Sequence, residues 1–328
     1  MVLTAAAVSA LANAPARADV ANFDGLTAPV VRVNLLYGNV VVRTADRPGI
    51  SVDADSTIEA TESSGSLGEG ARTFPILRGE IEGPNGPVLL PEESFVSTSL
   101  PRGPRAIVTF KGAGTLHLTI PAHTALLVVQ LVRGNVSVEG YRDGTFLVRV
   151  RNGAIRLSDD GGEAYVQTLR GPTYASDSTF AHLRARSGLG PIVFERCTAR
   201  QIEVASVEGG ILFDAGAFEP GLARFESQNG HVAIGVSGGS QIAAHSGAGR
   251  VYTQFDARTR VENRDGDATA IVGGGGPVVT ANSASGNVYL YDGSLRRHPA
   301  AEGWSPPSAV LRRASSEASP RARRPRRP

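Results

Sequence analysis

Cysteine, tryptophan and lysine are nearly absent from this 328-residue chain, and aromatic residues are scarce. A single cysteine, Cys197, excludes an intramolecular disulfide framework, and no group of Cys and His has the spacing of a zinc finger. Aromatic residues make up only 6% of the chain, which is too few for the core of an ordinary helical enzyme. No run of 18 apolar residues predicts a membrane-spanning helix.

Glycine, by contrast, is abundant, with 39 residues. It has no three-residue period, which excludes a collagen helix. The formal charge of +2 conceals an asymmetry along the chain. Residues 294–328 hold nine Arg and two Glu, a charge of +7, so the remaining 24 basic and 29 acidic residues carry −5.

The two ends of the chain differ from its middle in composition. Residues 1–18 are small and apolar and close on Ala16-Arg17-Ala18, which predicts a signal peptide and export to the periplasm, cell surface or medium. The basic segment that normally opens such a peptide is missing, so the alternatives are a truncated signal peptide and an alanine-rich disordered end. Residues 293–328 are rich in Pro, Ala, Ser and Arg and predict a disordered tail. This tail is either an electrostatic tether to an anionic envelope polymer or a solvated end with the arginine bias of a high-GC gene.

The middle of the chain is an internal repeat. Glycines recur there at a mean spacing of 19 residues, and they are Gly134, Gly153, Gly171, Gly190, Gly209, Gly230, Gly249, Gly266 and Gly286. Apolar residues stand two and four places after most of these glycines and five and seven places before them, with mostly polar residues between. This alternation is typical of strands with one buried face. Each unit therefore predicts two short strands joined at the glycine.

Stacking of such units predicts an all-β fold, a single-stack β-solenoid with rungs of about 19 residues. Residues 19–292 form this domain. In the expected register Val204 lies inside the stack, between Ala185 and Phe225. Small hydroxyl residues stand three places before most glycines, and we interpret them as a corner ladder that satisfies backbone groups. Residues 61–105, rich in Gly, Pro, Ser and Glu, predict an inserted loop.

Four segments resemble a known family: Leu116–Val128, Gly134–Gly140, Arg151–Leu157 and Ser283–Tyr291. They read LHLTIPAHTALLV, GNVSVEG, RNGAIRL and SASGNVYLY. Over about residues 30–292 the chain is similar to the bacterial putative-adhesin domains of unknown function, which are built of β-strand repeats. The resemblance implies an exported or envelope-associated β-solenoid with no established catalytic residues. The 61–105 insertion and the Arg/Pro-rich tail depart from that family.

Few residues suggest chemistry. No nucleotide-binding, nucleic-acid or hydrolase motif is present, and we expect no catalytic residue, metal or cofactor. One outward column places Glu226, His245 and Glu262 on three successive rungs of the predicted stack. Such a run could hold a metal or carry acid–base chemistry on a glycan, although a solvated ladder of ion pairs is the commoner explanation.

A second outward column is apolar on a face that should be wet. Tyr174, Val193, Leu212 and Tyr252 belong to it, and we take them as a candidate interaction patch. The alternative is that the 61–105 insertion covers them. Both interpretations stay open at the level of sequence.

We therefore expect an exported, non-enzymatic β-repeat protein that serves as an envelope scaffold, adhesion or binding module. A glycan-acting β-helix enzyme and a self-assembling filament that resembles bactofilins are the alternatives. The sequence names no partner. Another protein, a second copy of the chain, or an anionic envelope polymer bound by the arginine-rich tail are all compatible with it.

Overall fold

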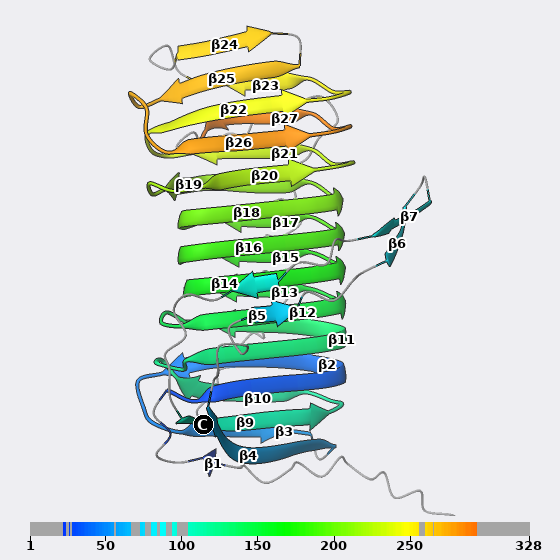
Figure 1. The fold of residues 1–328 in the computed structure, drawn as a ribbon, viewed down its shortest axis with the longest axis vertical. Helices are drawn as coiled ribbons and strands as arrows, with labels where there is room; N and C mark the ends of the chain where they lie inside the picture. The colour runs from blue at the N-terminus through cyan, green and yellow to red at the C-terminus, as the bar shows by residue number, and fades with distance from the viewer. Residues whose placement is uncertain are drawn as a thin grey trace, which may run out of the picture.

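The computed structural model describes residues 22–23, 26, 28–55, 57–66, 73–75, 80–83, 86–89, 94–96, 104–255, 260–264 and 266–293. The predicted signal peptide, about half of the insertion and the tail beyond Gly293 lie outside these residues. The described chain is all β, as predicted. It forms a long, mostly parallel sheet of 23 strands and two small two-stranded pairs (Figure 1). No described helix is long and apolar enough to cross a membrane.

The middle units each contribute two strands that meet at the repeated glycine. The first strands are β12 (Thr145–Asn152), β14 (Gly161–Arg170), β16 (Thr179–Leu189), β18 (Thr198–Glu208) and β20 (Ala223–Ser227). The second strands are β13 (Ile155–Ser158), β15 (Thr173–Ser176), β17 (Ile192–Glu195), β19 (Ile211–Phe218) and β21 (Val232–Val236). First strands pair in parallel with first strands and second with second, and we call these series the first and second ladders.

The core lies between the two ladders. Side chains alternate along each strand, so every second residue of both ladders enters one shared apolar cluster. Val204 pairs with Ala185 on one side and Phe225 on the other, as the register predicted. All three are buried.

The repeated glycines stack on one another at the bend between the two ladders. Gly153 has a φ of 147°, and a Cβ atom there would lie 1.7 Å from the carbonyl oxygen of Gly134. Gly171 and Gly190 repeat this contact one and two units further along. A side chain is therefore excluded at this bend both by the backbone conformation and by the neighbouring strand. This is the physical reason for the glycine period in the sequence.

The C-terminal end departs from the expected order. The last unit, β26 (Val278–Ser283) and β27 (Val288–Asp292), lies between the Gly230 unit and the Gly249 unit. The Gly249 unit consists of β22 (Ser240–Ser246) and β23 (Val251–Gln254), and it pairs with β26 and β27 from the other side. Stacking in chain order is thus wrong for these two units. Figure 1 shows β26 and β27 near the top of the stack, between the earlier strands β20 and β21 and the strands β22 and β23.

The Gly266 unit is also not a parallel unit of the stack. Its strands β24 (Arg260–Arg264) and β25 (Asp267–Val272) form an antiparallel pair, and β25 pairs antiparallel with β22. Arg264 pairs with Asp267, and Gly266 between them has a left-handed φ of 84°, so the chain reverses there. Because β25 occupies one edge of β22, the chain returns through Gly273–Gly276 to the other edge, where β26 pairs.

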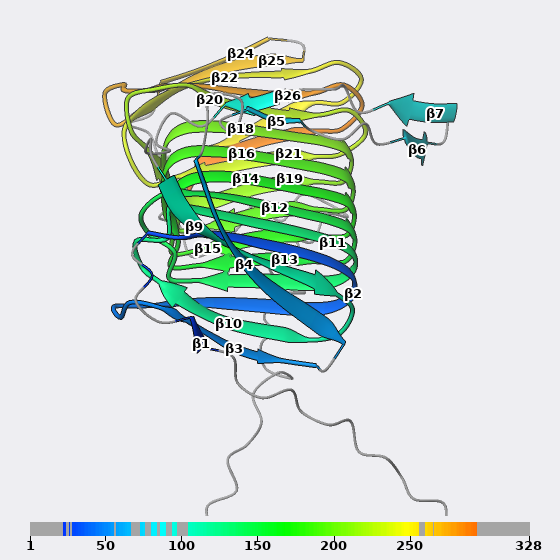
Figure 2. The same ribbon diagram turned by 60° about the horizontal axis from the view of Figure 1, so that its bottom comes forward.

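The N-terminal end has a similar rearrangement. The strands β2 (Val30–Ala45) and β11 (Leu126–Glu139) each run through both ladders. Strand β2 lies between β11 and the later strands β9 (Pro104–Gly112) and β10 (Leu116–Pro121). The strands β1 (Asn22–Phe23) and β3 (Ile50–Ala54) complete this end, which Figure 2 brings forward.

Strands enter the predicted insertion from both sides. β4 (Ile58–Ser66) pairs antiparallel with β9 up to Ser66 and Pro104. Inside lie two short antiparallel pairs. They are β5 (Thr73–Pro75) with β8 (Ser94–Val96), and β6 (Glu80–Gly83) with β7 (Gly86–Leu89). The rest of residues 61–105 lies outside the described chain.

Candidate functional site

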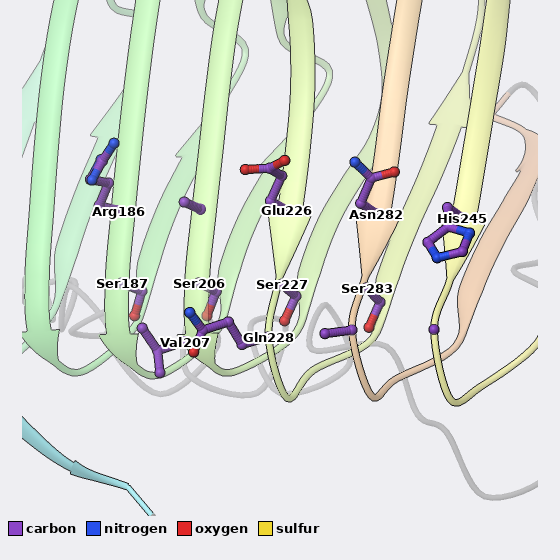
Figure 3. A pocket seen from close by; sticks show the side chains of 13 residues that line it. Arg186, Ser187, Ser206, Val207, Glu226, Ser227, Gln228, His245, Asn282 and Ser283 are labelled. Atoms are coloured by element: carbon purple, nitrogen blue, oxygen red, sulfur yellow. The ribbon is translucent and has the colours of Figure 1, made fainter. Parts of the chain in front are cut away.

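A groove of about 740 Å³ runs along the outer face of the first ladder, near the bend (Figure 3). It crosses β16, β18, β20, β26 and β22. Strand pairing places one residue from each strand in a single outward column, in the spatial order Arg186, Ala205, Glu226, Asn282 and His245. The groove is therefore a product of the inserted last unit, which brings Asn282 between Glu226 and His245.

The hollow of the groove is explained by side-chain size. Ala205 stands where the neighbouring strands carry Arg186 and Glu226, so a small residue lies between two long ones. Val207 and Ala284 add apolar lining, and Gln228 adds an amide. The result is a surface with a partly apolar floor and polar groups at intervals of about one strand spacing, roughly 4.8 Å.

A row of buried hydroxyls lies beneath this column. Ser187 donates to the Gly190 carbonyl at 2.9 Å, and Ser227 donates to the Gly209 carbonyl at 3.2 Å. Ser283 makes the same bond to Gly230 at 2.8 Å. The interpretation as a corner ladder is confirmed for these residues. Ser206 is the exception among the described hydroxyls of the row, since its buried Oγ has no hydrogen-bond partner.

The predicted Glu226–His245–Glu262 run is not continuous. Asn282 separates Glu226 from His245, because β26 lies between their strands. Glu262 pairs with Thr269, which in turn faces Ala243 rather than His245. The sequence prediction assumed chain-order stacking, and the reversal at Gly266 moves Glu262 to another column.

Each of the three residues has its own ionic partner. Glu226 accepts from Arg224 at 2.5 Å, His245 lies 2.7 Å from Asp267, and Glu262 accepts from Arg260 at 2.7 Å. Within the described residues, no three His, Cys, Asp or Glu side chains are grouped so that they could hold a metal ion. The groove thus presents one carboxylate, one guanidinium, amides and an imidazole, a set suited to hydrogen bonding.

The second ladder carries the predicted apolar column on its outer face, and most residues of this column are buried. Tyr174, Val193, Leu212 and Ala233 follow one another across paired strands. Tyr289 of the inserted unit comes next and pairs with Tyr252. Val193, Leu212 and Ala233 are 0% exposed and Tyr289 is 3% exposed, whereas Tyr252 is 42% exposed. The four predicted patch residues are therefore not equally available to a partner.

The tyrosines of the inserted unit close one end of this column. The rings of Tyr252 and Tyr289 stack with their centroids 5.2 Å apart and an interplanar angle of 10°. Tyr291 donates from its hydroxyl to Asp214 at 3.0 Å. Burial, with the nearby Asp214 charge, raises the pKa of Tyr291, and burial also raises the pKa of Tyr174. Sequence periodicity found the column but not the contribution of Tyr289 beside Ala233.

Comparisons with known proteins place no family name on the chain. No family model matches it, and no curated protein matches it. The crystal structure of a putative cell adhesion protein from Clostridium sporogenes matches 84% of this chain and 100% of that chain, with 9% sequence identity and a TM-score of 0.24. That protein is described in the same terms as the domains that the sequence resembles.

Proposed function

We propose that the protein is an exported β-solenoid, with rungs of about 19 residues, that acts as a non-catalytic binding or adhesion module of the cell envelope. We further propose that the groove over Ala205 binds an extended, uncharged glycan chain. The observation that carries this proposal is the groove itself, in which four of the five strands present a polar side chain in one column and Ala205 leaves an apolar hollow between Arg186 and Glu226.

The spacing and the chemistry both favour a polymer of hydroxyl-bearing units. Neighbouring strands present their side chains at intervals of about 4.8 Å, comparable to the length of one sugar unit in an extended chain. Asn282 and Gln228 can both donate and accept hydrogen bonds, as sugar hydroxyls do. A small apolar floor such as Ala205 and Val207 suits the C–H face of a sugar ring.

The charge of the groove favours an uncharged ligand over a polyanion. The column contains one guanidinium, Arg186, and one carboxylate, Glu226. The Glu226 carboxylate already accepts a hydrogen bond from Arg224. The Glu226 carboxylate at the centre of the groove would repel the anionic groups of a polyanion. This repulsion weakens binding more as the charges come closer together.

The arrangement of acids supports binding rather than hydrolysis. Glycosidases commonly place two carboxyl groups about 5–9.5 Å apart on either side of the scissile bond. Glu226 is the only carboxylate among the described residues that line this groove, and Glu262 lies in another column. The glycan-acting enzyme stays the alternative, with Glu226 as the residue that it would need.

Filling the groove tests the binding proposal. Ala205→Tyr should abolish binding to an array of neutral polysaccharides, because the new ring occupies the hollow between Arg186 and Glu226. Ala243→Tyr makes the same change on the same outer face, outside the groove. It should bind as the unaltered protein does. Equal binding by both variants, or no binding of any neutral glycan by the unaltered protein, would rule out this groove as the site.

A turnover assay on the same glycans distinguishes binding from catalysis. The proposal expects no release of shorter products by the unaltered protein. Product release that Glu226→Gln abolishes would establish the enzyme alternative instead. Export is tested separately by sequencing the mature N-terminus and locating the protein by cell fractionation, with cleavage after Ala18 expected.

A further inference from the structure

The buried stripe on the outer face of the second ladder raises the question of what covers it. The covered stripe comprises Tyr174, Val193, Leu212, Ala233 and Tyr289. Side chains alternate across a strand, and Phe194 and Phe213, the next residues after Val193 and Leu212, lie in the core between the ladders. Val193 and Leu212 therefore point away from the core, and an outward side chain loses all its exposure only when other atoms lie on it.

The inserted unit accounts for one end of the cover. A Cβ atom on Gly235 would lie 2.4 Å from the Tyr291 ring, and the Tyr291 hydroxyl reaches Asp214 on β19. The Tyr291 side chain thus extends from β27 past β21 and lies beside Ala233. Val193 is one strand beyond Leu212, so it lies further from β27 than Asp214 does. A second covering segment is needed there.

The described chain leaves the stack next to this stripe. Gly293 donates to the Val236 carbonyl at 2.8 Å. A Cβ atom on Gly293 would lie 2.9 Å from the Cα of Ala215, the residue after Asp214. The segment that follows, residues 294–328, therefore starts beside β19, within reach of Leu212.

Length and charge both suit that segment to the stripe. Trp304 lies 11 residues after Gly293, an extended reach of about 36 Å. From Tyr289 to Tyr174 the stripe crosses four strand spacings, about 19 Å. Glu195 and Asp214 stand two places after Val193 and Leu212 and so flank the stripe on its outer face. Residues 294–328 carry a formal charge of +7.

The insertion is in a less suitable place. Its flanking strands β4 and β9 lie at the N-terminal end of the stack, and β9 pairs with the Val30–Leu35 half of β2, in the first ladder. Figures 1 and 2 also show β5 on the side of the first ladder. The stripe belongs to the second ladder.

We propose that the C-terminal segment 294–328 folds back along the second ladder and covers the stripe, with Trp304 against Val193 and Leu212 and arginines beside Glu195 and Asp214. The stripe is then an intramolecular docking surface for the tail and not a free adhesion patch. Its occupant is an apolar and basic segment, so an external partner would have to displace a segment of that chemistry.

The fluorescence of Trp304 tests this proposal directly in the full chain, because it is the chain's one tryptophan. Native protein should emit at short wavelength and resist quenching by acrylamide. Leu212→Glu should shift the emission to the red and raise the quenching slope severalfold, towards its value in denaturant. Leu222→Glu, the same change at a side chain that is 51% exposed, should leave both signals unchanged.

If Leu212→Glu does not fold, a second variant that changes only a surface charge tests the same proposal. Glu195→Lys removes an acidic group beside the stripe without entering the core, and it should shift the emission in the same direction. Added salt should enhance that shift, since it screens the remaining attraction. Native emission typical of water would overturn the proposal, and so would buried emission that neither Leu212→Glu nor Glu195→Lys changes in a folded protein.

Discussion

The middle of the stack and its C-terminal end are built from the same repeat but are connected differently. From β12 to β21, each unit pairs with the unit that follows it in the chain. Beyond β21 the next unit in space is the last one in the chain, β26 and β27. The repeat pattern therefore determines which column each residue belongs to and which side of a strand is buried, but it does not determine which units are neighbours.

Ion pairs show the same contrast. In the middle they join neighbouring strands, as between Arg184 and Glu203 at 2.8 Å or Arg196 and Asp177 at 2.6 Å. Both pairs are 19 residues apart in the sequence. Towards the C-terminal end, Arg224–Glu226 and Arg260–Glu262 join residues two apart on one strand. His245–Asp267, 22 residues apart, also joins neighbouring strands, but these strands are antiparallel.

The largest expected effect is at the glycine bend of the middle units. Gly153→Ala adds a Cβ that would lie 1.7 Å from the Gly134 carbonyl oxygen, at a φ of 147°. Strained backbone and overpacking each cost about 1–3 kcal/mol, so we expect a loss of about 3 kcal/mol or more in the free energy of unfolding, measured by denaturant titration. Gly249→Ala, near the C-terminal end, lacks the strained φ and should cost less.

The control for this change is Gly238, which has no atom within 4 Å of its Cβ position. Gly238→Ala should change the free energy of unfolding by no more than about 0.5 kcal/mol. Equal shifts of the denaturation midpoint for Gly153→Ala and Gly238→Ala would show that the glycine stack does not limit stability.

Engineered disulfides test the order of the units themselves. Paired residues on adjacent parallel strands lie about 4.8 Å apart, within the range for a disulfide, whereas residues two strands apart lie about 10 Å apart. Glu226→Cys with Asn282→Cys should therefore oxidise to a crosslink that stabilises the fold by about 2–4 kcal/mol. Glu226→Cys with His245→Cys should not. Crosslinks are detected by non-reducing electrophoresis. A crosslink in the second pair alone would show that the units stack in chain order.

The sequence predicted the columns well because burial in a strand has a strict two-residue period. Val204, Ala185 and Phe225 were assigned to the core from that period alone, and all are buried. The position of Asn282 beside Glu226 could not be predicted in this way. The Gly286 unit carries the same pattern as its neighbours, so its inward side chains fit several positions in the stack. Its place is decided by the chain reversal at Gly266, because this reversal puts β25 on the outer edge of β22 and leaves only the other edge for β26.

The residues that meet in the groove and in the stripe depend on the order of the units. The Glu226–His245–Glu262 column was wrong as a continuous run because it assumed one order of units. The apolar stripe kept Tyr174, Val193 and Leu212 and gained Tyr289 from the inserted unit, whereas Tyr252 lies beyond Tyr289 and is exposed. Its burial depends on contacts from outside the repeat, which a periodicity within the repeat does not encode.

A smaller effect is expected at the hydroxyl row, where two serines on adjacent strands differ. Ser227→Ala loses the hydrogen bond to the Gly209 carbonyl and should cost about 1 kcal/mol. Ser206→Ala removes a buried hydroxyl that has no partner, so it should be neutral or slightly stabilising. Both are measured by thermal or denaturant unfolding. A greater loss at Ser206 than at Ser227 would contradict the assignment of their hydrogen bonds.

The smallest effect is expected at the ion pairs that distinguish the middle from the C-terminal end. The Arg196 guanidinium donates twice to Asp177, at 2.6 and 2.7 Å, and these bonds hold the pKa of that carboxyl below its usual range. Both side chains are more than half exposed, so solvent screening limits the loss from Asp177→Asn at pH 7 to less than about 1 kcal/mol. Because the folded pKa is depressed, this stabilisation is present above the unfolded pKa of about 4 and is lost as the pH falls through the folded value. The difference in the free energy of unfolding between Asp177→Asn and the unaltered protein should therefore shrink in acid, as measured by denaturant titrations across that pH range.

Glu262→Gln, which breaks the exposed pair within β24, should cost less at every pH. A difference for Asp177→Asn that persists unchanged at low pH would mean that packing, and not the ion pair between neighbouring strands, is what the substitution removes.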